Sequence, residues 1–254
     1  MKRVTFYLVF LFAFLPLYAS TLNLNTQFTK ANKLYNEKKY KEALKVYNSI
    51  KKSLEKKDLK SFKLYFNLGC TYYRLNDIAN SRLYFEKAKR IHPLNKELET
   101  NLSLIVSKLK DREKNIKDGF FVAFFKKIYL SFSLNTLTIL SILFFFMIFI
   151  FIAMLLSGRF DKKKSYYGIG VSLLLFLIFF SLFYSRYQFT FAKEGIVFSQ
   201  TLEVFSEPNT SSTVLFKIHK GTKVKEGEEI NGYVHIYLPD GLNGWIDKQY
   251  LKDI

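Results

Sequence analysis

The chain has 254 residues, 49% of them hydrophobic, and a formal net charge of +18 at pH 7. Residues 20–118 carry 23 Lys or Arg and 11 Asp or Glu, a net charge of +12, whereas residues 195–254 carry 6 and 8, a net charge of −2. The basic residues are scattered rather than gathered in one run, so we do not expect nucleic-acid binding. A single cysteine, Cys70, excludes an intramolecular disulfide and is expected to be a small core or groove residue.

Residues 1–19 have the pattern of a secretory signal peptide. Two basic residues, Lys2 and Arg3, precede an apolar run that ends at Leu17, and Ala19 closes a cleavage site. Leu17 is larger than the residue preferred at its position, which leaves an uncleaved anchor as the alternative. In either case the leader predicts that the following segment is exported.

Residues 20–118 have the pattern of paired helices. Small and aromatic residues recur where two closely packed antiparallel helices need them: Tyr65, Leu68, Gly69, Tyr72, Ser81, Phe85, Ala88 and Pro93. Their spacing matches the roughly 34-residue tetratricopeptide pattern. An upstream segment repeats the scheme with Ala31, Leu34, Tyr40, Ala43 and Tyr47. A third unit begins after Pro93 without a partner helix, so we expect a cap that faces solvent. The region therefore predicts an all-α tetratricopeptide (α-solenoid) domain.

A tetratricopeptide array of this kind binds protein segments on its concave face. By their position in the motif, six residues are expected on that face: Asn32, Tyr35, Lys63, Phe66, Tyr73 and Arg74. Asn32, Lys63 and Arg74 have the chemistry to hold a peptide carboxylate through charge-assisted hydrogen bonds. The alternative is that all six are ordinary surface residues of a short scaffold.

The stretch from Ile128 to Gly158 contains no charged residue. Residues 135–156 and 166–184 each have the composition of a transmembrane helix, because about 20 apolar residues cross a ~30 Å hydrocarbon core. The loop between them, residues 157–165, is net positive, which predicts that it is cytoplasmic and that the flanking domains are extracytoplasmic. A hairpin buried in a soluble core is the alternative, but it would need a larger soluble domain.

Two short segments flank this hairpin. Residues 119–134 combine aromatic bulk with Lys126 and Lys127, which favours an amphipathic helix lying in the membrane interface. The alternative is that they extend the first span. Residues 185–194 are expected to be a linker.

Residues 195–254 consist of short runs separated by Gly, Pro, Asn and Asp, with clear alternation from Tyr233 to Leu238. About five short strands predict a small, partly open, all-β SH3-like barrel. Three motifs in this segment resemble a bacterial SH3 (SH3b) domain: V-F-S-E-P (204–208), H-K-G-T-K-V (219–224) and L-P-D-G-x-x-G-W-I (238–246). Phe205 stands where members of that family often carry Arg. Trp245 and Tyr250 are the candidate ligand-face residues, with packing of the barrel as the alternative.

The order of the segments also resembles a known family as a whole. A leader, repeats containing NLGCTYYRLND and HPLNKELETNL, two spans after SLNTL, and an SH3b tail are similar to the BatE-type proteins of the Bat aerotolerance operons. The resemblance implies partners among the von Willebrand-type and other membrane proteins of the Bat system. It also implies a role in envelope stress or oxygen tolerance.

The sequence contains no pattern that predicts an enzyme, a cofactor site or a metal site. The three histidines, His92, His219 and His235, lack metal-ligand spacing, and there is no glycine-rich phosphate loop or G-x-S-x-G motif. We therefore predict a non-enzymatic scaffold of the cytoplasmic (inner) membrane that binds protein partners through the repeat groove. One alternative is a cell-wall protein whose SH3b domain binds peptidoglycan and which recruits a hydrolase. Another is an accessory subunit of an envelope enzyme complex.

Overall fold

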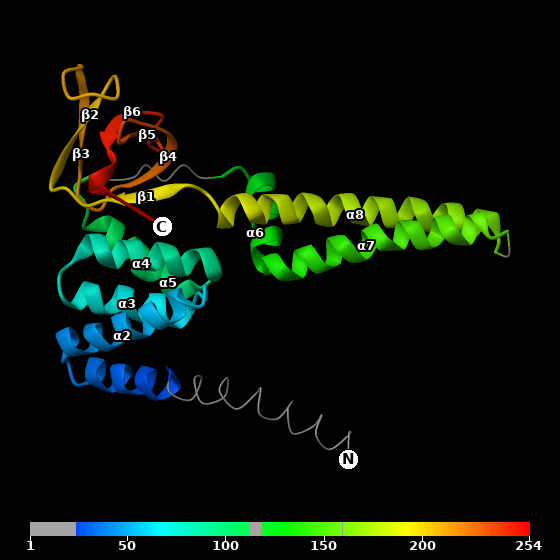
Figure 1. Cartoon of the computed structure of the whole chain (residues 1–254), viewed down its shortest axis with the longest axis horizontal. Helices are drawn as coiled ribbons and strands as arrows, with labels where there is room; N and C mark the ends of the chain where they lie inside the picture. Colours follow the sequence, from blue (N-terminus) through cyan, green and yellow to red (C-terminus); the bar gives the residue numbers. More distant parts are fainter. Residues whose placement is uncertain (1–23, 112–117, 159) are drawn as a thin grey trace, which may run out of the picture.

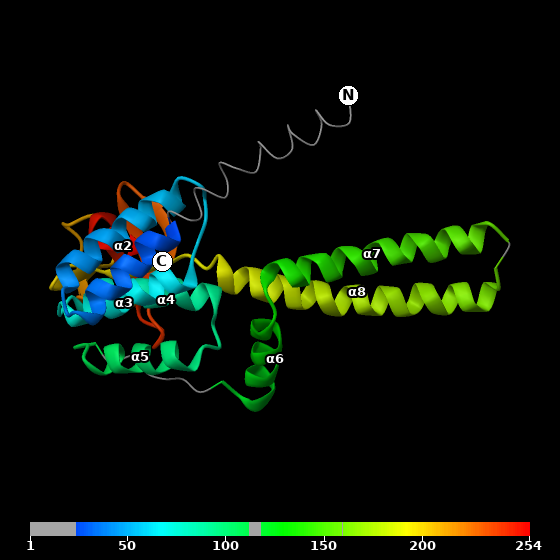
Figure 2. The ribbon, with the colours of Figure 1, turned by 90° about the horizontal axis from the view of Figure 1, so that it is seen from below.

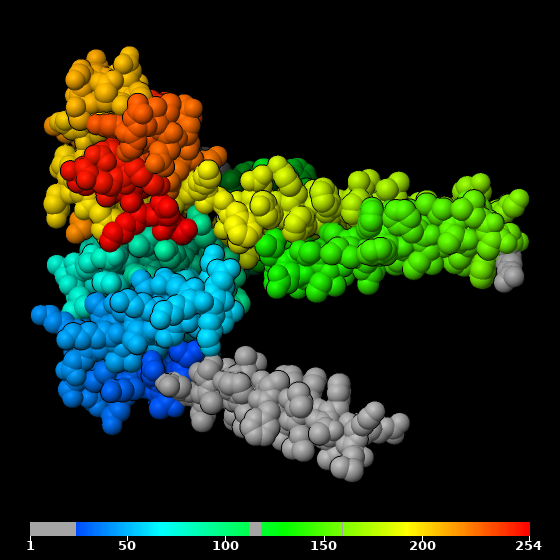
Figure 3. Space-filling view, viewed as in Figure 1, coloured from blue at the N-terminus to red at the C-terminus, as the bar shows by residue number. Residues whose placement is uncertain are grey.

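The structure, a computed structural model, describes residues 24–111, 118–158 and 160–254. A helical repeat domain and a C-terminal sheet lie together at one end, and a long two-helix hairpin projects from them (Figure 1). The space-filling view shows the sheet in direct contact with the helical domain (Figure 3). This arrangement confirms the multidomain fold class. The expected signal peptide at residues 1–19 lies outside the described residues.

The repeat domain consists of short antiparallel helices. Residues 24–36 are helical, and they are followed by α2 (Tyr40–Glu55), α3 (Phe62–Arg74), α4 (Ile78–Ile91) and α5 (Lys96–Ser107). The last three helices each begin after a side-chain cap, because the side chains of Ser61, Asp77 and Asn95 accept a hydrogen bond from the backbone N–H three residues further on. The predicted pairing of helices is therefore confirmed.

The close approach of α3 and α4 depends on two small residues, as the sequence predicts. A Cβ atom added at Gly69 would lie 2.5 Å from the ring of Phe85, so the ring occupies the space that a side chain would need. Ser81 Oγ donates to the carbonyl oxygen of Gly69 at 2.8 Å. Tyr72 and Tyr84 stack in parallel beside this contact, with ring centroids 5.4 Å apart.

The hairpin is formed by α7 (Leu134–Leu156) and α8 (Lys162–Thr190), both long and apolar enough to cross a membrane. Its apolar side chains are largely exposed, so the alternative of a hairpin buried in a soluble core does not apply to this structure. The two helices approach closely at Gly168, where an added Cβ would meet the ring of Phe151 at 2.4 Å. The helix α8 begins at Lys162 within the expected loop and continues to Thr190, so residues 185–190 are helical rather than part of a linker.

A separate helix, α6 (Phe120–Ser131), precedes the hairpin. It runs across the foot of the hairpin rather than along α7 (Figure 2). The chain is extended at Phe132, and Ser133 then caps α7. Four rings on α6 are exposed, those of Phe120, Phe121, Phe124 and Phe125. The alternative that this segment simply extends the first span is wrong, because α6 ends before α7 begins, and its position in a membrane interface stays a prediction.

The C-terminal domain is a seven-stranded antiparallel sheet with the order β3-β2-β6-β5-β4-β1-β7. The strands are β1 (Glu194–Val197), β2 (Thr201–Phe205), β3 (Val214–His219), β4 (Lys223–Ile230), β5 (Tyr233–Tyr237), β6 (Asn243–Asp247) and β7 (Leu251–Asp253). The sheet is open, with β3 and β7 at its edges, so the expected barrel does not close. The structure has seven strands where about five were expected, and a turn at Gly221, whose φ is +91°, separates β3 from β4.

The sheet is fixed to the repeat domain along one face of α4. Arg82, Glu86 and Arg90 are spaced four residues apart, which places them on one side of the helix. Arg82 is 1% exposed, and its Nη1 donates to the carbonyl oxygen of Gly221 at 2.8 Å. The Glu86 carboxylate accepts a bond of 3.1 Å from Lys223 Nζ. We call these three residues and their partners on the sheet the α4 seam.

Arg90 extends the α4 seam to the first and last strands. Its Nη1 donates to the carbonyl oxygen of Ile254 and its Nη2 to that of Ala192, each at 2.5 Å. Glu194 lies 3.5 Å from Arg90 and 2.9 Å from Lys223, so opposite charges alternate along the seam. Each buried charge in this row thereby has an opposite charge or a hydrogen-bond acceptor.

A second contact holds the β3–β4 turn. Asp111, just beyond α5, accepts hydrogen bonds from the backbone N–H of His219 at 2.6 Å and from Thr222 Oγ1 at 2.8 Å. Its other oxygen lies 2.7 Å from His219 Nδ1. Burial opposes ionisation of Asp111, but these hydrogen bonds outweigh it and lower the pKa of the carboxyl. Leu109 packs where a side chain at Gly221 would stand, so only glycine fits the turn.

Glu86 makes the α4 seam sensitive to acid. Burial opposes its ionisation, but the attraction of Lys223, Lys89 and Arg82 prevails and lowers its pKa below the ordinary value of 4.5. A carboxyl with a depressed folded-state pKa stabilises the fold above its unfolded pKa, and this contribution is lost as the pH falls through the folded pKa. The Glu86→Gln variant should lower the unfolding temperature at neutral pH, since breaking a buried pair costs about 3–5 kcal/mol.

We expect the gap in unfolding temperature between wild type and Glu86→Gln to narrow as the pH falls below about 4.5. Circular dichroism of the full chain in detergent, followed on heating at several pH values, measures this gap. The exposed Glu229→Gln, also in the sheet, is the matched control and should stay close to wild type. A gap that keeps the same size from neutral to acidic pH would contradict the assigned role of the Glu86 charge.

Candidate functional site

The candidate groove is carried by the helix at residues 24–36 and by α3, neither of which supplies the α4 seam. The structure brings five of the six predicted residues into local contacts and leaves Lys63 exposed. Phe66 lies between the rings of Phe62 and Phe85, at centroid distances of 5.8 and 5.7 Å. It is half-buried, so it is partly a core residue and only partly available to a ligand.

Asn32 is part of a polar network that joins successive repeats. Its Oδ1 accepts hydrogen bonds from Tyr47 Oη at 2.7 Å and from Asn67 Nδ2 at 2.9 Å. Burial raises the pKa of Tyr47 to about 12, so its hydroxyl remains a donor at neutral pH. Asn32 therefore has a structural role that the motif position alone did not indicate, and Asn67 is a member of the network that sequence reasoning missed.

The remaining groove residues form two pairs of a tyrosine with a cation. Arg74 Nε donates to Tyr35 Oη at 3.5 Å. Lys108 Nζ donates to Tyr73 Oη at 2.8 Å and lies 4.5 Å from the centre of the same ring. Lys108 was not among the predicted residues because it follows α5, beyond the matched part of the motif. The groove thus offers cations to an acidic or carboxylate-bearing peptide.

Cys70 lies on α3 close to these cations. Burial, together with the charge of Glu97, raises the pKa of its thiol to about 11, while Arg74 acts in the opposite direction. Because the thiolate is the reactive form, this thiol is a poor nucleophile at neutral pH. Its setting agrees with the expected small core or groove residue and does not support a redox role.

The sheet presents a row of aromatic side chains on its outer face. Trp245 pairs across the strands with Phe205 on one side and His235 on the other, and its ring centre lies 5.0 Å from that of His235. Tyr237 follows on the same face, 4.7 Å from His235. Strand pairing and the alternation of side chains therefore bring these four rings together on one face. Of the four, only Trp245 was predicted from the sequence as a ligand-face residue.

The two predicted ligand-face residues occupy different settings. Trp245 is 8% exposed, so most of its surface packs against the sheet, as the alternative interpretation expected. Tyr250 is 40% exposed and lies in a 3₁₀ turn, Lys248–Tyr250, between β6 and β7. The more accessible rings of the aromatic face are those of His235 and Tyr237.

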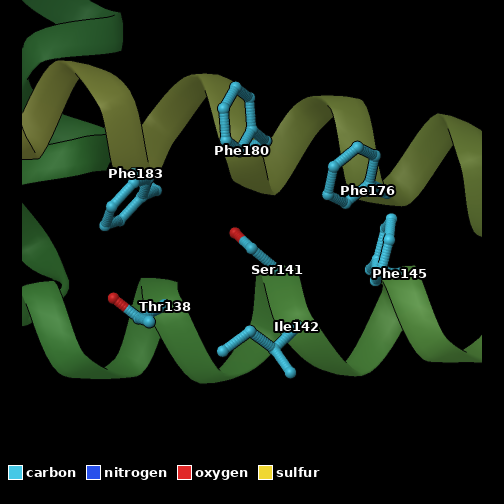
Figure 4. Close-up of a pocket in the computed structure, with 7 residues that line it drawn as sticks. All are labelled: Thr138, Ser141, Ile142, Phe145, Phe176, Phe180 and Phe183. Carbon is cyan, nitrogen blue, oxygen red and sulfur yellow. The ribbon is translucent and has the colours of Figure 1, made fainter.

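The hairpin contains an apolar cleft of about 180 Å³ between α7 and α8 (Figure 4). Phenylalanine rings line it from both helices, among them Phe145, Phe176 and Phe183. The two hydroxyls in the cleft, those of Thr138 and Ser141, donate to carbonyl oxygens four residues earlier in their own helix. The cleft therefore offers a surface for hydrocarbon or another helix rather than for a polar ligand.

No metal site is formed by groups of three or more His, Cys, Asp or Glu within the described ranges. The comparisons with known proteins agree with the two interaction modules. Residues 62–95 match the family model for the tetratricopeptide repeat, and residues 200–252 match that for the bacterial SH3 domain. A search of curated proteins found no match. The chain therefore combines a tetratricopeptide repeat with an SH3b domain, two modules that serve protein–protein interaction and, for SH3b, cell-wall binding.

Proposed function

We propose that the protein is a membrane-anchored, non-catalytic scaffold that presents a tetratricopeptide groove and an SH3b face on the outer side of the cytoplasmic membrane. The observation that carries the proposal is the α4 seam. It joins the two binding modules through buried charges while leaving the cations of the groove, such as Arg74 and Lys108, exposed. The apolar hairpin supplies the anchor, and the basic loop at its tip supplies the orientation.

The resemblance to BatE-type proteins adds a specific proposal about partners. The groove would hold a segment of a von Willebrand-type or other membrane protein of a Bat system, and the complex would act in envelope stress or oxygen tolerance. The exposed cations of the groove suit an acidic segment or a free carboxylate.

Topology is the first test. Single cysteines at Lys56, Lys163 and Thr210, in a Cys70→Ser background, report the repeat domain, the hairpin tip and the sheet. At the tip, Lys163 is exposed and can be labelled, whereas Ser165, two residues further on, is only 2% exposed. A membrane-impermeant maleimide applied to intact cells, after any outer membrane has been opened, should label the first and third positions only. Labelling of Lys163→Cys alone would place both domains in the cytoplasm and overturn the proposal.

A photoreactive amino acid placed in the groove tests partner binding. At Lys63 it should crosslink to a membrane-protein partner in cells, and the adduct should fall about a hundredfold or more when Arg74 and Lys108 are both changed to Glu, since each charge-assisted hydrogen bond is worth about 1.5–3 kcal/mol. The matched control is the same photoreactive group at Lys45, which is exposed on α2. Equal adducts from both positions, insensitive to the charge reversals, would rule out a groove-specific partner.

A second candidate function is peptidoglycan binding by the SH3b domain, which the aromatic outer face favours. The full chain in detergent should then co-sediment with purified murein sacculi. His235→Ala and Tyr237→Ala together should reduce binding about thirtyfold, because stacking and polar contacts of this kind are each worth roughly 1 kcal/mol. Lys252→Ala, on the edge strand β7, serves as the control. Sedimentation that is absent, or unchanged in the double variant, removes this candidate.

A further inference from the structure

A cavity of about 430 Å³ lies where the repeat domain meets the foot of the hairpin. Three segments enclose it: the turn between α4 and α5, the turn between α6 and α7, and the last turns of α8. The lining groups that matter chemically are His92, Asn95, Ser131, Ser133 and Arg186. Its volume is within the range of about 300–1,000 Å³ typical of small-molecule sites.

Among the described residues that line this cavity, Arg186 is the only arginine or lysine. It is 3% exposed, and its guanidinium bonds to backbone carbonyls of two of the enclosing segments. Its Nε donates to Phe132 at 3.3 Å, and its Nη2 donates to Arg90 at 3.2 Å and to Ile91 at 3.4 Å. Within the described ranges, Nη1 is buried without a hydrogen-bond partner, and no carboxylate forms an ion pair with Arg186.

A buried guanidinium of this kind lacks a counter-ion. The carbonyl groups at the end of α4 offset part of its charge, because the C-terminal end of a helix is partially negative. They do not neutralise it, and a buried polar atom without a partner costs about 1–3 kcal/mol or more. The free Nη1 thus points to an anion with oxygen acceptors, and the planar guanidinium fits phosphate oxygens especially well.

Two helix starts add to the positive potential of the cavity. Asn95 caps α5 and Ser133 caps α7, and both residues line the cavity. Helix N-termini favour phosphate and other anions through their backbone N–H groups and the helix dipole. The site therefore combines a buried cation that has an unused donor with the N-termini of two helices, which are 12 and 23 residues long.

The position of the cavity indicates the source of the anion. The helix α6 crosses the foot of the hairpin (Figure 2). Its exposed phenylalanine rings would lie, in an interfacial helix, at the boundary between headgroups and acyl chains. We propose that this cavity binds a phosphate group, and that the group belongs to an anionic phospholipid. The choice of a lipid source rests on the membrane anchoring proposed above, whereas the phosphate chemistry rests on Arg186 and the helix starts.

The test uses the delipidated full chain in a non-ionic detergent. Native mass spectrometry counts bound phosphatidylglycerol and gives its Kd, with phosphatidylcholine and inorganic phosphate as the other probes. The delipidated wild type should bind one phosphatidylglycerol molecule when this lipid is added back. Arg186→Gln should weaken its binding about tenfold or more, the loss expected for a charge-assisted hydrogen bond. Lys193→Gln removes the same charge from an exposed position nearby and should change Kd by less than about twofold.

Arg186 also supports the junction, so a second variant keeps it intact. Ser131→Trp, at the end of α6, fills the cavity and leaves Arg186 in the chain, so it should abolish lipid binding while the helical circular dichroism stays unchanged. If inorganic phosphate binds with the same dependence on Arg186 and displaces phosphatidylglycerol, the source is free phosphate. If neither probe binds, or if Arg186→Gln or Ser131→Trp binds phosphatidylglycerol like wild type, the phosphate site is refuted. Because binding is measured in detergent, this result is independent of topology and of protein partners.

Discussion

The structure depends on one face of α4, where Arg82, Glu86 and Arg90 follow one another at intervals of four residues. Removing these charges from water is costly, and the cost is recovered only when Gly221, Lys223, Ala192 and Ile254 are in place. A shifted sheet would leave buried charges without partners. Apolar contact between Leu83 and Ile196 adds area to the same interface, but it does not dictate one position in the way the charges do. The seam is therefore primarily a determinant of geometry.

The end of α4 extends this constraint to the hairpin. Arg90 bonds the sheet through its side chain, and its carbonyl oxygen accepts a hydrogen bond from Arg186 of α8. One turn of helix thus connects the repeat domain with the sheet and with the apolar hairpin. The repeat domain and the sheet are thereby held at a set orientation to the apolar hairpin. The α6 helix, which contacts α8, completes the same junction.

The sequence predicted the features that depend on local pattern. Gly69, Ser81 and Phe85 stand at a spacing that only closely packed helices require, and the apolar length of the hairpin is evident without any tertiary information. The seam was not predicted, because Arg82 and Glu86 look like ordinary exposed helix charges until their partners are known. Those partners lie more than 130 residues away in the chain. Arg186 was assigned to a linker for the same reason.

Other differences have a similar origin. About five strands were expected from the sequence and the structure has seven, because short turns such as the one at Gly221 divide runs that look continuous in the sequence. Leu109 of the repeat domain packs beside this turn, and no local signal reveals that contact. Lys108 lies beyond the repeat motif and joins the groove only through the hydrogen bond from its Nζ to Tyr73 Oη of α3. Local periodicity therefore determines the helices and strands, whereas the composition of the candidate sites depends on how the domains meet.

A rigid connection between two binding modules has consequences for the partners they accept. When modules are joined by a flexible linker, their effective concentration depends on linker length and the span between sites can adapt. Here the segment between α8 and β1 is only a few residues long and Arg90 bonds to Ala192 within it, so the linker has little freedom. A partner that contacts both the groove and the aromatic face must match a fixed separation. Partners that do match lose less conformational entropy on binding, because the scaffold is already ordered.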